Sequence, residues 1–249
     1  YSSVTLNAGK NKPVKFDLAM ENYGMDYYMW DAGKPYWDGY TGKLPVKDGE
    51  QASYEASGTN RYFNGNKAQF HAVNACKVCP NANEAALYAF RGDPHWDETT
   101  LWVKNKHLYK GGMWFLKLKY CSGGPYTSPV TTYPGDVDYR ANSYWATWNE
   151  ATKTVNGSSW VKAPGQGRPA DTSKYFYLPA MGYLDNDGGK QGVLKLNTAG
   201  YQGAYWTSTS VVFSGWSLQA ICLHFSKTEV GLDADLRWWA YPIFTVADK

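Results

Sequence analysis

The feature that most constrains this chain is a pair of alternating segments close to its C-terminal end. In residues 220–225 the apolar side chains Ile221, Leu223 and Phe225 occupy every second position, and residues 229–233 repeat this pattern. A period of two is typical of β-strands that bury one face and leave the other in water. We therefore predict two half-buried strands whose inner faces are aliphatic and aromatic.

The outer faces of these two predicted strands carry a mixture of small, polar and charged residues. By alternation, the outward positions are Cys222, His224, Ser226, Glu229, Gly231 and Asp233. Residues 234–239 are expected to form a loop that ends in Trp238 and Trp239, and two adjacent side chains of an extended segment cannot both point inward. We expect this end of the chain to be a scaffold that displays a surface, and we expect the displayed surface to carry the function.

The composition is that of a globular chain without a strong preference for a charged partner. Of the 249 residues, 43% are hydrophobic and 19% are charged, as in folded proteins. The net charge of +3 is too small to favour nucleic acid as a partner. No apolar run approaches the ~18 residues of a membrane span, so we expect membrane contact only through an anchor outside this chain. Because the chain begins at Tyr1 without a methionine or a leader, we expect it to be a processed piece of a longer product.

Aromatic residues are unusually frequent, at 17% of the chain, with 12 Trp and 21 Tyr. Tyr and Trp combine a large apolar ring with a polar tip, which suits exposed recognition surfaces. The same residues can instead pin long loops onto a core. Both explanations stay open for most of the chain, and display is favoured only in the last forty residues or so.

The four cysteines do not make a convincing metal site. Cys76 and Cys79 have the spacing of a zinc knuckle, but no second pair completes the tetrahedron, and His71 is the nearest candidate third ligand. A local disulfide or two unpaired thiols is the simpler interpretation. Residues 185–189 lack the third alternating ligand and the distant Glu of a calcium loop. We therefore predict no metal and no cofactor.

One helix is clearly marked in the sequence. Asn81 can cap it, Glu84 can complete a capping box three residues later, and Gly92 can end it. A second short helix is expected near residues 97–102. Gly turns and short apolar stretches elsewhere predict antiparallel strands, including one in residues 175–183. The fold class is therefore predicted to be α+β, a single domain over residues 1–249 with few helices, short strands and long loops.

Several segments of the chain resemble surface proteins of gut Bacteroidetes. The matching motifs are GMDYYMWD (24–31), PNANE (80–84), GDPHWD (92–97), HLYKGGMWF (107–115) and YFYLPA (175–180). The C-terminal stretch is similar to the variable region of those proteins at Tyr205, Trp206, Thr207, Ser208, Ala220, Leu223, Phe225, Val230 and Arg237. Pro242 stands where the family often has Arg, and Thr245 and Val246 replace a Gly pair. The chain is thus identified as similar to variable proteins of diversity-generating retroelements, which have a C-type lectin fold in the branch shared with formylglycine-generating enzymes.

The resemblance implies that an error-prone reverse transcriptase rewrites chosen codons at the 3′ end of the gene while the scaffold stays constant. The variable ligand-binding region then covers residues 203–246. With Trp216, which we add as an exposed aromatic anchor, the expected binding residues are Ile221, Cys222, His224, Ser226, Glu229, Gly231, Asp233, Ala234, Asp235, Leu236, Trp238, Trp239 and Tyr241. The expected partner is a protein or glycan on another cell or phage surface, so the expected location is extracellular, on a cell surface or a phage particle.

Catalysis is less well supported by these residues. Cys222 and His224 share a strand face, but such side chains stand about 7 Å apart, too far for direct proton transfer. Asp233 and Asp235 offer the two carboxylates of a glycosidase, as many acidic loops do. We predict that the protein is not an enzyme. Two alternatives stay open: a fixed adhesin or pilus-tip module without diversification, and a hydrolase or oxidase on the same fold.

Overall fold

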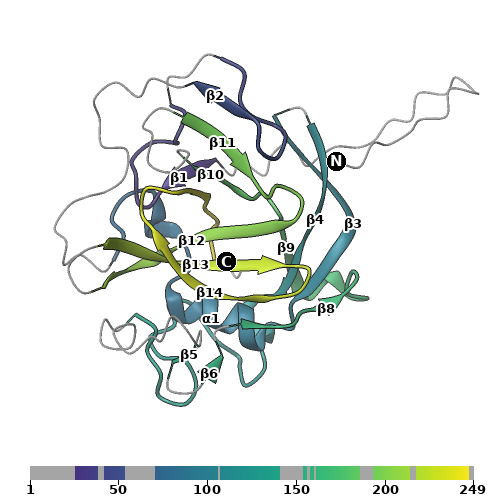
Figure 1. The fold of residues 1–249 in the computed structure, drawn as a ribbon. Helices are drawn as coiled ribbons and strands as arrows, with labels where there is room; N and C mark the ends of the chain where they lie inside the picture. Colours follow the sequence, from purple (N-terminus) through teal and green to yellow (C-terminus); the bar gives the residue numbers. More distant parts are fainter. Residues whose placement is uncertain are drawn as a thin grey trace, which may run out of the picture.

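The computed structural model describes residues 26–38, 42–53, 71–105, 107–140, 154–155, 158–159, 161–185, 193–213 and 217–246. These residues form three main β-sheets, a small hairpin and one α-helix (Figure 1). The predicted α+β class with few helices is confirmed in this form. Most of the 185–189 segment and Trp216 lie outside the described residues.

The largest antiparallel pairings occur in the C-terminal sheet, which has the order β12-β13-β14-β7. Its strands are β12 (Gln202–Phe213), β13 (Ser217–Ser226), β14 (Val230–Leu236) and β7 (Val161–Lys162). The two strands predicted from alternation are therefore confirmed. Their register places Trp206 opposite Cys222 and Cys222 opposite Asp233. The loop expected over residues 234–239 is shorter than predicted, because β14 continues to Leu236.

A second sheet has the order β8-β3-β4-β9. Its strands are β3 (His95–Lys104), β4 (His107–Leu116), β8 (Gly165–Gln166) and β9 (Tyr175–Pro179). The helix expected near residues 97–102 is wrong, since this segment is the middle of β3, where the register with β4 shifts between Asp97 and Leu101. The strand expected in residues 175–183 is confirmed over residues 175–179 as β9, which ends at Pro179. Gly111 and Gly112 lie within β4.

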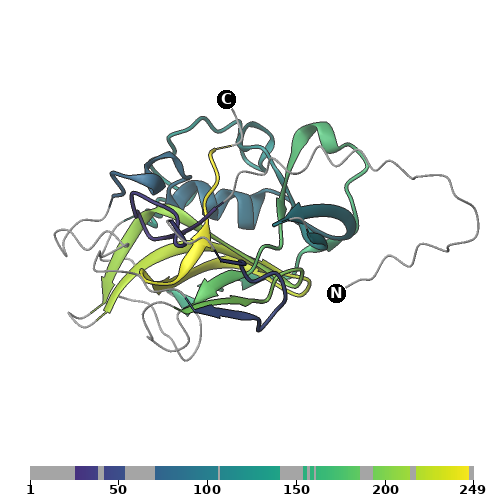
Figure 2. The same ribbon diagram turned by 90° about the horizontal axis from the view of Figure 1, so that it is seen from above.

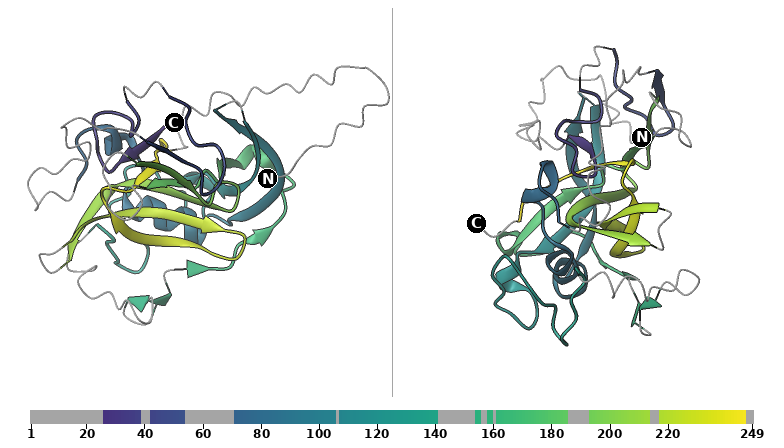
Figure 3. Two further views of the ribbon diagram at one scale, coloured as in Figure 1. Left: turned by 45° about the horizontal axis from the view of Figure 1, so that its top comes forward. Right: turned by 90° about the vertical axis from the view of Figure 1, so that its left-hand side faces the viewer.

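The third sheet joins segments from both ends of the described chain, in the order β1-β15-β10-β11-β2. Its strands are β1 (Tyr27–Met29), β2 (Gln51–Ser53), β10 (Tyr183–Asp185), β11 (Val193–Asn197) and β15 (Ala240–Pro242). Tyr27 pairs with Pro242, and Met29 pairs with Ala240. The small hairpin of β5 (Thr154–Val155) and β6 (Ser158–Ser159) lies at the periphery (Figure 3).

The single α-helix of the described chain, α1 (Ala82–Arg91), lies along one face of the C-terminal sheet (Figure 2). Leu87 and Tyr88 of α1 are fully buried in the main apolar cluster, which also contains Phe115 of β4 and Leu223 and Phe225 of β13. Burying a large apolar side chain stabilises a fold by about 1.5–3 kcal/mol. The helix is thus the main cover of the C-terminal sheet on that side.

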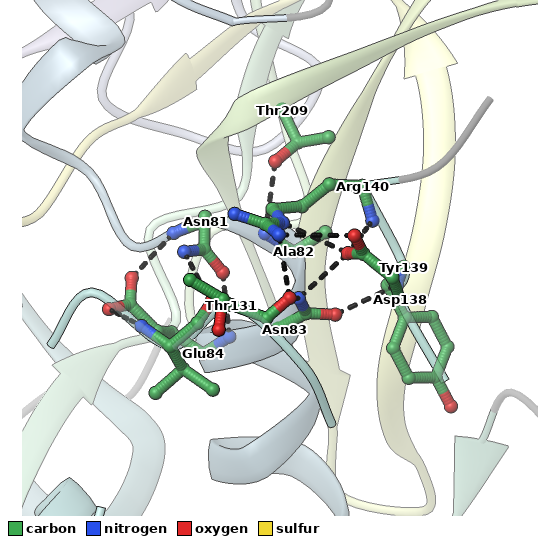
Figure 4. Close-up of polar contacts among 10 residues, drawn as sticks. Asn81, Ala82, Asn83, Glu84, Thr131, Asp138, Tyr139, Arg140 and Thr209 are labelled. Atoms are coloured by element: carbon green, nitrogen blue, oxygen red, sulfur yellow. Dashed lines mark hydrogen bonds and ion pairs between the residues drawn. The ribbon is translucent and has the colours of Figure 1, made fainter. Parts of the chain in front are cut away.

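The start of α1 is held as the sequence predicts. Asn81 accepts a hydrogen bond from Glu84 N at 3.0 Å, and Glu84 Oε2 accepts from Asn81 N at 2.7 Å, which completes the capping box. Gly92 follows the last helical residue. The same end of the helix binds neighbouring segments (Figure 4): Asn83 Nδ2 donates to Asp138 Oδ1 at 2.8 Å, and Ala82 N donates to Thr209 Oγ1 of β12 at 3.0 Å. These contacts connect α1 both to the residue 130–140 loop and to the C-terminal sheet.

The irregularity in β3 is organised by the buried carboxylate of Asp97. Its oxygens accept hydrogen bonds from the backbone and hydroxyl groups of Thr99 and Thr100, and from Trp114 Nε1 at 3.0 Å. Although burial acts in the opposite direction, these hydrogen bonds hold the pKa of Asp97 well below its usual range. Asp97 is therefore a structural anion at the point where the strand bulges.

Replacing Asp97 with Asn is expected to lower the free energy of unfolding at neutral pH by about 1–3 kcal/mol, because the amide offers one oxygen where the carboxylate offers two. The folded-state pKa is lowered, so the carboxylate stabilises the fold above the unfolded pKa of about 4 and loses this effect as the pH falls. The difference between parent and variant should therefore shrink from pH ~5 towards pH ~2 in urea titrations. Asp136→Asn, at an exposed turn residue, is the matched control. A parent–variant difference that does not change with pH would contradict this role.

Candidate ligand-binding face

The C-terminal sheet has an inner face, turned towards α1, and an outer face of opposite parity. Ile221, Leu223 and Phe225 are all buried in the main apolar cluster, so the predicted inner face is confirmed. We define the outer face by the residues Ala204, Trp206, Ala220, Cys222, His224, Gly231, Asp233 and Asp235. The register of the strands places these residues in adjacent rows.

Much of the outer face is covered by other parts of the chain. Cys222 is 0% exposed, Tyr241 of β15 is 2% exposed and His224 is 9% exposed, and Gly231 is buried as well. Cys222 and Tyr241 belong to a second apolar cluster, whose other members are Trp30, Cys76, Cys79, Ala204, Trp206 and Ala220. The expectation that Cys222, His224, Gly231 and Tyr241 are displayed is therefore wrong. Alternation separates the two faces of a strand, but it does not say whether distant segments cover the second one.

Three further predicted binding residues have the parity of the inner face. Ile221 is fully buried, and Ala234, its partner in the register, packs against the main apolar cluster. Leu236 has the same parity and is half-buried. Burial leaves Ile221 no surface for a ligand, and Ala234 and Leu236 lie on the opposite side of β14 from Asp233 and Asp235. These three assignments are corrected accordingly.

The remaining predicted residues are accessible. Glu229 is exposed, and Ser226, Asp233, Asp235, Trp238 and Trp239 are half-buried. Four of them lie in the second half of β14 and in the turn to β15. We call Asp233, Asp235, Trp238 and Trp239 the accessible rim.

Asp235 connects the accessible rim to the buried floor beneath it. Its Oδ2 accepts a hydrogen bond from the Tyr241 hydroxyl at 2.8 Å and from Cys222 Sγ at 3.2 Å. Burial, reinforced by the charge of Asp235, raises the pKa of both Cys222 and Tyr241. The thiol is therefore protonated at neutral pH, and a protonated thiol is a poor nucleophile.

Stacked aromatic rings support the rim from below. Trp239 stacks on Tyr183 of β10, with ring centroids 5.4 Å apart and planes 14° from parallel. Tyr241 lies between Trp239 and Trp206, with centroid distances of 6.2 Å and 4.4 Å. Trp206 Nε1 also donates to Tyr28 O at 2.7 Å. Sequence reasoning did not place Tyr183 in this site, because it comes from a separate strand and has no motif of its own.

Arg237 fixes the turn that carries the two tryptophans of the rim. Its side chain is fully buried, with Nη2 2.7 Å from Ser210 Oγ, Nε 3.1 Å from Gln219 O and the guanidinium 4.5 Å from the centroid of the Trp30 ring. Burial lowers the pKa of Arg237 to about 10, and the negative charge of Asp31 opposes this shift. The guanidinium therefore stays charged at neutral pH and holds the residue 237–239 turn from inside.

Asp31, the nearby anion, organises the segment that covers the outer face. It accepts hydrogen bonds from Val73 N at 2.7 Å, Asn74 N at 2.8 Å and Cys76 N at 3.1 Å. Its own N–H donates to Cys76 Sγ at 3.1 Å. The segment around residue 75 is thus held against the sheet by one buried carboxylate.

The catalytic pairs considered from the sequence are engaged with other groups. Cys222 donates to Asp235, and His224 Nε2 lies 3.6 Å from Glu229 Oε1, across the turn between β13 and β14. Cys76 and Cys79 are buried free thiols, and burial together with the neighbouring Cys79 raises the pKa of Cys76. Within the described ranges, no three His, Cys, Asp or Glu side chains converge as metal ligands. In the same part of the chain, no helix has both the length and the apolar character needed to span a membrane.

Comparisons of the chain with protein-family models, with curated proteins and with solved structures gave no match. The assignment of function therefore depends on the geometry of the site and on the resemblance described above.

Proposed function

We propose that this protein is a ligand-binding protein displayed on a cell surface or phage particle, and that the accessible rim at the end of β14 is its binding site. The observation that carries the proposal is the contrast between rim and floor. Asp233, Asp235, Trp238 and Trp239 are half-buried, whereas Cys222 and Tyr241 directly beneath them are fully enclosed. A rigid buried floor lets the side chains above it change without loss of the fold.

The chemistry of the rim suits recognition of a protein or a glycan. Two indoles provide rigid contact area at low entropic cost, and the carboxylates beside them provide polar selectivity. The Trp239–Tyr183 stack orients one indole before any ligand arrives, which reduces the entropic cost of binding. The protonated thiol of Cys222 favours binding over nucleophilic catalysis at this face.

We further propose that the fold is of the C-type lectin type and that a retroelement diversifies the C-terminal face. The proposal is supported by the way fixed and accessible positions alternate within one short segment. Arg237 is fully buried between Asp235 and Trp238, which are both accessible. The same segment therefore contains a structural anchor and residues that can vary.

Sequencing the 3′ end of this gene in many isolates tests the proposal. We expect the differences to concentrate in the codons of the accessible rim, and Arg237, Leu223 and Phe225 to stay constant. A nearby near-copy of the segment should differ from it mainly at adenines. An invariant 3′ end would exclude diversification and leave a fixed adhesin. Differences spread evenly over inner-face and rim codons would contradict the scaffold argument.

A further inference from the structure

A pocket of about 600 Å³ lies at the other end of β14 from Asp235 and Trp239. Its walls come from the 46–48 loop, β3, the first half of β4, the 199–201 turn and the β13–β14 turn. In Figure 1 the hairpin of β13 and β14 approaches β3 and β4. The volume lies within the ~300–1,000 Å³ of typical small-molecule sites.

The walls of the pocket are fixed to one another before any ligand binds. Lys227 of the β13–β14 turn forms a 2.8 Å ion pair with Glu98 of β3. The Tyr109 hydroxyl donates to Val46 O at 2.5 Å, and Asp48 accepts a hydrogen bond from Thr198 N. These bonds cross between segments that are distant in the sequence, so the pocket is preformed.

Close approach of two backbones also shapes the pocket. Gly111 has a φ of +93°, and a Cβ at this position would lie 2.5 Å from Gly200 O. No other residue fits there without displacing the 199–201 turn. The two glycines leave bare backbone in the wall, where a side chain would otherwise fill the space.

The lining combines aromatic rings with groups of both charges. Trp96 is buried in the wall of the pocket. Tyr201 lies at the mouth of the pocket and is 62% exposed, an unusual position for a large ring. Three lysines, at 47, 110 and 227, stand against two carboxylates, at 48 and 98. The lysines and carboxylates of the lining together carry an excess of one positive charge.

We propose that this pocket binds an acidic saccharide, that is, a sugar ring with one carboxylate. Hydroxyl groups both donate and accept hydrogen bonds, and the pocket offers ammonium donors and carboxylate acceptors together. A plain anion would be repelled by Asp48 and Glu98, and a plain cation by the lysines. The exposed ring of Tyr201 at the mouth of the pocket provides a flat apolar face for the sugar ring. The excess positive charge matches a single carboxylate. Because Lys227 is already paired with Glu98, we assign this carboxylate to Lys110, an exposed residue of the lining.

Isothermal titration of the full chain with sodium glucuronate, and with glucose as the matched neutral sugar, tests the inference. Glucuronate should bind saturably and glucose at least about tenfold more weakly, because only glucuronate has a carboxylate that can accept a charge-assisted hydrogen bond. Lys110→Ala and Tyr201→Ala should each weaken glucuronate about tenfold, and Tyr201→Phe, which keeps the ring, should retain most of the affinity. Both residues are exposed, so these variants are expected to fold normally.

Three results would overturn the assignment: no saturable glucuronate binding below roughly 20 mM, equal binding of glucose, or unchanged binding by both alanine variants. Sodium acetate is a further probe, because acetate that binds as tightly as glucuronate would make this an anion site without a role for the sugar. Tyr120→Ala removes another exposed tyrosine, one outside the pocket, and should leave the titration unchanged. The pocket and the accessible rim lie at opposite ends of β14, so this experiment and the sequencing test can fail separately.

Discussion

Replacing Arg237 with alanine is expected to lower the free energy of unfolding by about 3–5 kcal/mol, the usual cost of removing one partner from a buried charged network. The variant would lose hydrogen bonds to Ser210 Oγ and Gln219 O and the contact with the Trp30 ring. Burial raises the pKa of Asp31, and the variant would also remove the nearby positive charge of Arg237 that opposes this shift. Urea denaturation followed by tryptophan fluorescence measures the change, with the slope of the transition as a check on two-state behaviour.

Arg237→Lys is the matched variant for this prediction. Lysine keeps the charge but presents a compact ammonium in place of the planar guanidinium, so it cannot reproduce both hydrogen bonds and the ring contact. We expect a loss between those of the parent and the alanine variant. If Arg237→Ala unfolds within about 0.5 kcal/mol of the parent, as an ordinary surface substitution does, then the anchoring role of Arg237 is wrong.

Replacing Trp206 with alanine is expected to cost a similar amount, about 3–5 kcal/mol. The indole is fully buried, donates to Tyr28 O and packs against Tyr241 with centroids 4.4 Å apart. Its removal leaves a cavity directly under the accessible rim. We therefore expect the variant to lose stability and also to loosen Tyr241, which can be measured as faster amide hydrogen exchange in β15.

Trp238→Ala is the control for the Trp206 prediction, because it removes an indole of the same size from a half-buried position. Its cost should be about 1 kcal/mol or less, with unchanged exchange in β15. Equal losses from the two variants would mean that rim and floor are not distinct, and would remove the basis of the proposed binding site.

Sequence predicted the parts of this fold that local chemistry decides. The side chains of Asn81 and Glu84 satisfy the backbone groups at the start of α1, and both lie within one turn of that start. The alternation of Ile221, Leu223 and Phe225 likewise identified β13 and its inner face, because both depend only on neighbouring residues.

The prediction of a helix near residues 97–102 failed because the side chain of Asp97 can bond the neighbouring backbone in two different structures. Asp97 precedes two threonines and can cap a helix, but its carboxylate instead accepts their hydrogen bonds within a strand bulge. Short polar side chains can hydrogen-bond the backbone either as a helix cap or within a strand bulge, and the local sequence pattern is compatible with both. Here the pairing of β3 with β4 decides in favour of the strand.

The candidate site was only partly predictable for a different reason. Alternation assigned Cys222 to the outer face correctly, but Trp30 and Cys76, which cover that face, come from the opposite end of the chain. The pocket near Tyr201 is composed of five separate segments. Two of them overlap the motifs at residues 92–97 and 107–115, but no local pattern brings the five segments together. Burial and pocket shape are long-range properties, so a pattern of neighbouring residues cannot determine them.

The pairing of β1 with β15 has a consequence for biosynthesis. A ribosome releases the segment around Tyr27 long before it translates Ala240–Pro242, so β1 waits for its partner while most of the residues between them are synthesised. Premature stops and frameshifts introduced upstream of β15 would leave Trp30 and Tyr27 uncovered on the nascent product, as ready targets for proteases and chaperones. If the proposed diversification operates, products truncated before β15 would be removed during synthesis, and only chains that contain β15 would complete this sheet.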